Sequence, residues 1–314
     1  MTKHIEDKLD KIPILNLVVR FFKQIRLPGF EGLSIYDLLE LYIMGIVKGA
    51  LTTRASAIAF SFFTAIFPFL LFVIIIIPYI PIADFQAEFL DFLNSFLPPQ
   101  TSDFFFSNIF ENISGGAGAG LVSSVFLLSM LLMANGVNAV FSGFENSYHE
   151  QLTRNVFQQY MYALGVALIL AFLVLLTVAF FGYFQIYIIA PIYEVFTGEE
   201  VVDSGVGWLI FAKYMFFVVM VYLATATLYY FGTKEGRHTR FFSIGALLTT
   251  LLIILTSYLF GIYIDNFSQY NKLYGSIGAL LILLLYLWLN SNILLLGYEL
   301  NASLRRLRKI NNNE

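Results

Sequence analysis

Six long apolar segments dominate the sequence and restrict the folds that are open to this chain. A helix rises about 1.5 Å per residue and the hydrocarbon core of a bilayer is roughly 30 Å thick, so each segment is long enough to cross a membrane. Hydrophobic residues make up 59% of the chain and charged residues only 12%, which is too apolar for a soluble domain. The sequence therefore predicts an all-α polytopic membrane protein, with a bundle of six transmembrane helices over residues 54–304. The predicted spans are about 56–80, 121–144, 160–189, 208–231, 242–264 and 276–300.

The sixth apolar segment carries polar residues on two opposite sides. On a helical wheel, one side holds Asn290, Gly297 and Asn301, and the nearly opposite side holds Asn292, Glu299 and Ser303. A helix with polar residues on two faces is poorly suited to contact lipid on either face. We therefore predict that this helix lies inside the bundle.

The second apolar segment has a polar stripe along one side. Its members lie at helical spacing and are Asn135, Asn138, Ser142, Glu145 and His149. Such a stripe requires a neighbour other than lipid, and the sixth segment offers comparable polarity at a matching depth. The two helices are therefore predicted to face one another, with Glu145 and Glu299 toward the cytoplasmic end.

These polar residues have two interpretations. The first is a substrate path whose candidate members are Asn135, Asn138, Glu145, Asn290, Asn292, Glu299, Asn301 and Lys213. The second is a static set of hydrogen bonds between helices, in which Glu145 or Glu299 pairs with Arg54 or Arg154. The path is favoured because Asn and Glu occur on both faces of the sixth segment. Lys213 also fits a simpler role, in which its long side chain reaches the outer membrane interface.

The first apolar segment combines small residues with a proline. Ala57, Ser61 and Ala65 recur at every fourth position, a pattern that lets a second helix approach closely. Pro68 removes a backbone hydrogen bond in the middle of the segment, which predicts a kink or a local break.

Three flanking regions complete the predicted organisation. Residues 1–53 are predicted to form cytoplasmic or interfacial amphipathic helices, at about 12–26 and 34–48. Phenylalanines at helical spacing predict two short helices on the outer face, within residues 85–113. Residues 305–314 are predicted to form a basic cytoplasmic tail.

The stretch YIDNFSQYNKLYGSIGALLILLLYLWLNSNILLLGYELNASL resembles the C-terminal signature of the YihY/BrkB family of bacterial inner-membrane proteins. The signature residues are Asn266, Tyr270, Asn271, Tyr274, Gly275, Gly278, Leu296, Gly297, Glu299, Leu300 and Asn301. Weaker matches are RASAIAFSFFTAIFPFLLF, which begins at Arg54, and residues 138–154. Family members were once labelled as a ribonuclease, and others have been associated with serum resistance, efflux or lipid handling. Candidate structural or ion-pairing residues are Arg54, Arg154, Pro68, Asp265, Asn266, Tyr270, Tyr274, Gly275 and Gly297.

The sequence lacks the residue patterns of a hydrolase or nuclease. Its histidines, His4, His149 and His238, are widely separated and there is no cysteine, so we expect no metal site, no cofactor and no enzymatic activity. A net charge of −3 gives no basic field for nucleic acid. We expect membrane lipids as partners and a transporter or exporter of an amphipathic substrate, such as a lipid or a hydrophobic metabolite. The alternative is an envelope scaffold or lipid-binding protein that transports nothing.

The distribution of cations predicts the topology. Of the 18 Lys and Arg residues, all except Lys213 and Lys272 lie in segments that a six-span topology places on one side of the membrane. We therefore predict that both termini lie in the cytoplasm, and the family resemblance implies a multi-pass protein of the bacterial inner membrane. A reporter that is active only in the cytoplasm should be active when it is fused at Asn313. A fusion at the same position that is active only in the periplasm would contradict this topology.

Overall fold

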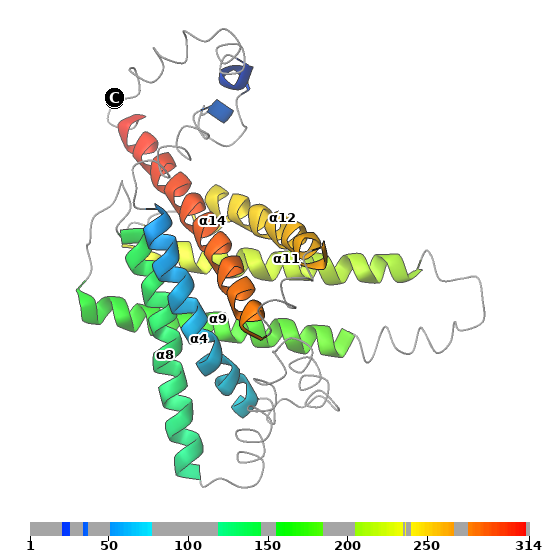
Figure 1. Ribbon diagram of the computed structural model, residues 1–314. Helices are drawn as coiled ribbons and strands as arrows, with labels where there is room; N and C mark the ends of the chain where they lie inside the picture. Colours follow the sequence, from blue (N-terminus) through cyan, green and yellow to red (C-terminus); the bar gives the residue numbers. More distant parts are fainter. Residues whose placement is uncertain are drawn as a thin grey trace.

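The computed structural model describes residues 21–25, 34–36, 51–76, 119–145, 155–184, 205–234, 236, 240–266 and 276–311. The long elements of this part of the chain are all α-helices (Figure 1). They are α4 (Leu51–Ile76), α8 (Ala119–Glu145), α9 (Val156–Phe184), α11 (Gly205–Gly232), α12 (Ile244–Asn266) and α14 (Ser276–Asn311). Each contains a span long and apolar enough to cross a membrane, six spans in the described residues. The predicted all-α polytopic bundle is confirmed.

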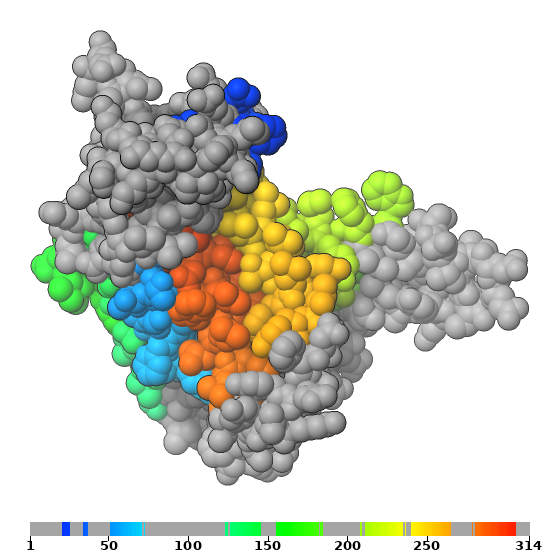
Figure 2. All heavy atoms as spheres, turned by 45° about the horizontal axis from the view of Figure 1, so that its top comes forward, coloured from blue at the N-terminus to red at the C-terminus, as the bar shows by residue number. Residues whose placement is uncertain are grey.

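The helices pack as a ring in the order of the chain. Each contacts the next, and α14 contacts α4 and so closes the ring. In Figure 1, α4 lies between α8 and α14, and the neighbouring helices α9 and α11 cross behind them. Figure 2 shows α14 between α4 and α12 on one face of the molecule. The first and last transmembrane helices are therefore direct neighbours.

Small side chains set the contact between α4 and α8. A Cβ atom added at Gly136 of α8 would lie 3.0 Å from the Cβ of Ala65 and 3.6 Å from the carbonyl oxygen of Ser61. Side chains this small let two helix backbones approach closely. The predicted packing role is thus confirmed for Ser61 and Ala65. It is wrong for Ala57, whose side chain is exposed.

Two features of the helices differ from the sequence predictions. α4 continues through Pro68, which is buried, so the predicted local break is wrong. Helices in a membrane tolerate proline when their surroundings satisfy the freed backbone groups. α14 runs without interruption to Asn311, so most of the predicted tail is helical.

Several sequence predictions fall mainly or wholly outside the described residues. The outer helices within 85–113 are outside, as are Arg154, Tyr270, Tyr274 and Gly275. Of the predicted N-terminal helices, only residues 21–25 and 34–36 are described. There the amide of Ile35 donates a hydrogen bond to the carbonyl of Ile25 at 3.1 Å.

The predicted wheel of the sixth segment is confirmed in its second half. Gly297 and Asn301 face α12, whereas Glu299 on the other side faces α4. Residues 297–304 are all buried, as the predicted interior position requires. In the first half of α14, Leu281 and Leu285 are exposed.

Two glycines allow α12 and α14 to cross closely. A Cβ atom at Gly297 would collide with Thr249 Oγ1 and would lie 2.6 Å from the hydroxyl of Tyr229 and 2.9 Å from the carbonyl oxygen of Gly245. A Cβ atom at Gly245 would collide with the carbonyl oxygen of Gly297. A backbone oxygen cannot rotate away as a flexible side chain can. Neither position can therefore accept a side chain without separation of the helices.

Gly297→Ala should therefore destabilise the protein by about 1–3 kcal/mol or more, the range observed for overpacked cores. The midpoint of thermal unfolding in detergent measures this loss. Gly261→Ala on α12 is the matched control, because no atom lies within 4 Å of the added methyl group. Equal unfolding midpoints for the two variants would contradict the close crossing.

Candidate functional site

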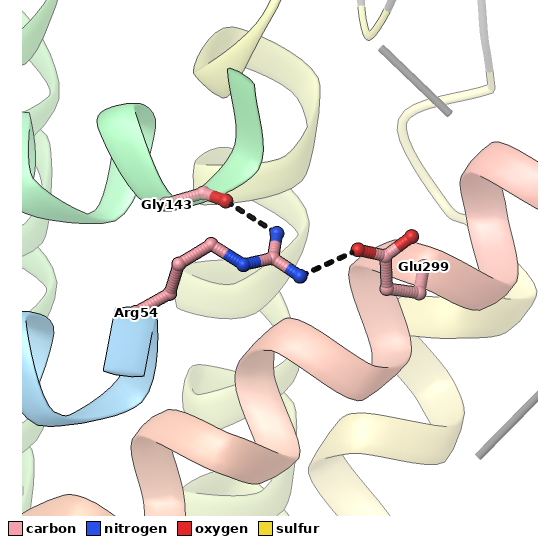
Figure 3. A network of polar contacts seen from close by, with 3 residues as sticks. All are labelled: Arg54, Gly143 and Glu299. Atoms are coloured by element: carbon pink, nitrogen blue, oxygen red, sulfur yellow. Dashed lines mark hydrogen bonds and ion pairs between the residues drawn. The ribbon is translucent and has the colours of Figure 1, made fainter. Parts of the chain in front are cut away.

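Arg54 joins three helices at one end of the bundle. It lies in the first turn of α4, and its Nη1 donates a hydrogen bond to the carbonyl oxygen of Gly143 on α8 at 2.8 Å. Its Nη2 donates to Oε1 of Glu299 on α14 at 2.9 Å (Figure 3). The side chains of Arg54 and Glu299 are only 11% and 10% exposed. We call these three residues the Arg54 junction.

A buried ion pair of this kind is costly to form, and the loss of one of its partners by mutation is costly as well. Its desolvation can exceed its Coulombic attraction, so an apolar contact of similar volume holds two helices at least as well. Removal of one partner, in contrast, leaves a charge without its counter-charge in a poorly hydrated place. The pair between Arg54 and Glu299 therefore fixes which surfaces of α4 and α14 meet more than it adds net stability.

Three aromatic rings pack beside the Arg54 junction. Phe144 of α8 stacks on Tyr298 of α14, with ring centroids 4.1 Å apart and an interplanar angle of 10°. Tyr229 of α11 packs edge-on against both rings, at 5.5 Å from Phe144 and 5.9 Å from Tyr298. Pairs in these geometries contribute about 0.5–1.5 kcal/mol beyond their area burial. The three rings connect α8, α11 and α14.

The hydroxyl groups of the two tyrosines are also bonded. The Tyr229 hydroxyl donates to the carbonyl oxygen of Leu294 at 2.7 Å and lies 2.6 Å from Thr249 Oγ1 on α12. The Tyr298 hydroxyl donates to Thr233 Oγ1 at 3.1 Å. Tyr229 therefore links α11 to both α12 and α14 by polar contacts within an apolar region.

Asn301 of α14 caps the N-terminus of α12. The backbone amide of Gly245 donates to Asn301 Oδ1 at 2.9 Å, and Asn301 Nδ2 donates to Ser243 Oγ at 2.9 Å. Ser243 itself accepts a hydrogen bond from the amide of Ala246 at 3.2 Å, as an N-cap residue does. The first amides of a helix have no partner within the helix, so a side chain from α14 completes α12.

The remaining helix, α9, joins the same end through a side-chain contact. Gln159 in its first turn is buried, and its Nε2 donates to Ser142 Oγ of α8 at 3.1 Å. Glu145 is also buried at this end, beside Phe144. We call this region the converging end, since residues of all six helices meet in it.

The structure does not bring the other predicted path residues to this site. Asn290 Nδ2 donates to the carbonyl of Tyr286, and Asn292 Nδ2 donates to the carbonyl of Trp288, so both NH2 groups bond within α14 itself. On α8, Asn135 is exposed and Asn138 is half-buried. The prediction that Asn135 faces the interior is wrong, because the buried face of α8 is formed by its small and apolar residues.

The predicted facing of the second and sixth helices also needs correction. Most of α8 packs against α4 and α9, and α8 meets α14 only near Phe144. Lys213 lies far from the converging end, since it precedes Tyr229 by 16 residues on α11, or about 24 Å along the helix. Its Nζ lies 5.3 Å from the ring centroid of Phe181 on α9.

A sequence profile of the family described as virulence factor BrkB matches residues 44–314. The chain belongs to the virulence factor BrkB family. The match contains every member of the Arg54 junction and all six long helices, so the converging end lies wholly within the BrkB region.

Individual relatives agree with this assignment. A protein of Bacillus subtilis (strain 168), named ribonuclease-like protein YfkH, is 25% identical over 260 residues, which cover 82% of this chain and 91% of the relative. A UPF0761 membrane protein of Psychrobacter sp. (strain PRwf-1) is 29% identical over 109 residues, or 35% of this chain and 20% of the relative. A UPF0761 membrane protein of Xanthomonas oryzae pv. oryzae (strain PXO99A) is 41% identical over 64 residues, or 20% of this chain and 15% of the relative. No solved structure matches the chain.

Several residues of the converging end were missed in the sequence analysis. Tyr229 and Thr249 lie in predicted spans and Gln159 lies just before one, and none of the three was assigned a role. A buried tyrosine needs a partner for its hydroxyl, so the position of Tyr229 within a predicted span could have indicated a polar contact between helices. Tyr298 lies between the signature residues Gly297 and Glu299 and could have been found from them. No group of three or more potential metal ligands occurs in the helices that the structure describes.

Glu299→Gln should lower the free energy of unfolding by about 3–5 kcal/mol, because glutamine keeps the shape but leaves the Arg54 cation without its counter-charge. Ser291→Ala on the same helix is the control. Its buried hydroxyl bonds only to the carbonyl of Leu287, and its loss should cost no more than about 1–2 kcal/mol. A Glu299→Gln variant as stable in thermal unfolding as Ser291→Ala would contradict the importance of the pair.

Proposed function

We propose that this BrkB-family protein is a transporter or exporter that moves an amphipathic substrate, a lipid or a hydrophobic metabolite, across the bacterial inner membrane. The observation that carries the proposal is the Arg54 junction. It joins the first and last helices of the ring at the end where all six helices meet. On the predicted topology this end is cytoplasmic. A closure at one end is what a transporter needs in one of its two access states.

The chemistry of the closure supports a movable contact. Apolar residues would hold α4 against α14 without the desolvation of two charges. An ion pair near the membrane boundary can instead separate at a limited cost, because water reaches each charge when the helices part. We infer that Arg54 and Glu299 separate when the cytoplasmic end opens, and that α4 and α14 part at this point.

The second candidate is an envelope scaffold or lipid-binding protein that transports nothing. Two observations favour it: the pair of Arg54 and Glu299, which the static interpretation predicted, and the side-chain NH2 groups of Asn290 and Asn292, which donate to carbonyls of their own helix. A path lined by these amides would be expected to offer them to a substrate. Our proposal therefore places the moving contact at the Arg54 junction and assigns no path role to these two asparagines.

The proposal includes no hydrolytic activity. The name of the Bacillus relative refers to a ribonuclease, and that name describes the relative. The description of the family to which the chain belongs names a virulence factor and no enzyme. Two of the relatives are named only as membrane proteins. Transport, in contrast with hydrolysis, requires only binding and a change of access, which six packed helices can provide.

Purified protein in phospholipid vesicles tests the proposal with two tracers, a phospholipid with a fluorescent headgroup and a membrane-permeant amphipathic dye. For the lipid, a reductant added outside destroys only outward-facing fluorophores. Vesicles with protein should therefore lose more fluorescence than empty vesicles, or should equilibrate the dye faster. Rates equal to those of empty vesicles for both tracers would contradict transport and favour the scaffold.

Variants of the junction then test its role in movement. Glu299→Gln should raise the rate for the active tracer, because it weakens the closure, whereas Ser291→Ala should leave the rate unchanged. A folded Glu299→Gln protein with an unchanged rate would restrict the ion pair to a structural role.

A further inference from the structure

Lys213 lies near the first end of α11. It follows Gly205, where α11 begins, by eight residues, and Phe181 precedes Phe184, where the neighbouring helix α9 ends, by three residues. The Lys213 Nζ is 5.3 Å from the Phe181 ring centroid. A lysine near the end of a membrane helix can extend its ammonium group to the headgroup region.

The ammonium group of Lys213 has an aromatic partner and, among the residues that the structure describes, no acidic one. The side chain is half-buried against α9, and it forms no ion pair with a carboxylate of the described residues. A cation over a ring gains only part of the stabilisation that an anion would supply. An anion at the ammonium group would therefore add stabilisation that the ring does not supply.

Exposed aromatic side chains occur at the same ends of α9 and α11. Trp208, Phe211 and Tyr214 of α11 are 75%, 54% and 66% exposed, and Tyr183 of α9 is half-exposed. Aromatic residues concentrate where acyl chains meet headgroups, because one end of the side chain is apolar and the other is polar. This belt marks the depth at which a lipid phosphate would lie.

Phe217 continues the same face one helical turn deeper. It follows Lys213 by four residues, its ring lies 6.4 Å from that of Phe181, and it is 42% exposed. A lipid with its headgroup at Lys213 would therefore place an acyl chain along Phe217. The Lys213 cation would lie at the anionic headgroup and the Phe217 ring beside the acyl chain, so the two residues match the two ends of an anionic lipid.

We propose that the face formed by Lys213, Phe181 and Phe217 binds an anionic phospholipid, with the headgroup phosphate at the Lys213 ammonium. This site lies at the opposite part of α11 from Tyr229 and the converging end, so it is independent of transport through the bundle. Lysine suits the role because its compact ammonium group pairs with phosphate as a point charge.

A single tryptophan reporter can test the site. The chain has two tryptophans, Trp208 and Trp288, and both are replaced by phenylalanine while Phe217→Trp adds the reporter. The full-length protein is reconstituted in phosphatidylcholine vesicles that contain brominated phosphatidylglycerol or, in a parallel sample, brominated phosphatidylcholine at equal mole fraction. Bromine quenches a nearby tryptophan. Quenching in the phosphatidylglycerol sample should exceed quenching in the phosphatidylcholine sample by the amount that corresponds to an enrichment of about fivefold beside the reporter. One lysine near an anionic surface contributes about 1 kcal/mol, which equals that factor.

Variants at Lys213 complete the test. Lys213→Gln should abolish the difference between the two lipids, and Lys213→Arg should keep it. High salt should weaken the difference in protein that retains Lys213, which provides a readout that needs no change at this position. Equal quenching by both lipids would overturn the proposal. So would a preference for phosphatidylglycerol that Lys213→Gln leaves intact.

Discussion

The bundle depends on one buried guanidinium group. Arg54 binds the carbonyl of Gly143 and the carboxylate of Glu299, and so holds the first, second and last transmembrane helices at one point. Gly143 contributes through its lack of a side chain, since a Cβ atom there would lie 2.8 Å from Ile58 of α4. The close approach of α8 and α4 is what brings the carbonyl within reach of Arg54. The ring of helices thus closes where the Arg54 cation meets the carboxylate of Glu299 and the carbonyl dipole of Gly143.

A second set of contacts fixes α12 and α11 to the same end of α14. Asn301 completes the N-terminus of α12, and the Tyr229 hydroxyl bonds to both α12 and α14. In lipid the hydrophobic effect does not distinguish one apolar helix face from another, so packing and interhelical hydrogen bonds must specify the partners. The polar residues of the converging end supply that specificity.

The fold was largely predictable from the sequence, whereas the site was predictable in part. Apolar length alone located six spans, because a membrane requires its spanning segments to satisfy their own backbone hydrogen bonds. The wheel of α14 correctly separated Glu299 from Gly297 and Asn301, since both sets lie on one regular helix. Polarity alone could not distinguish Asn292, which bonds to its own helix, from Asn301, which bonds to α12. That distinction depends on which helix lies opposite, and one sequence does not contain it.

The measurement that tests the account most directly is a double-mutant cycle at the ion pair. The free energies of unfolding are compared for the unaltered protein, Arg54→Met, Glu299→Met and the variant with both changes. Methionine approximates the length of each side chain without its charge. If the pair specifies the contact between α4 and α14, each single change should destabilise strongly and the double variant should recover most of the loss, because no charge is left without its partner. Losses that simply add would contradict the account.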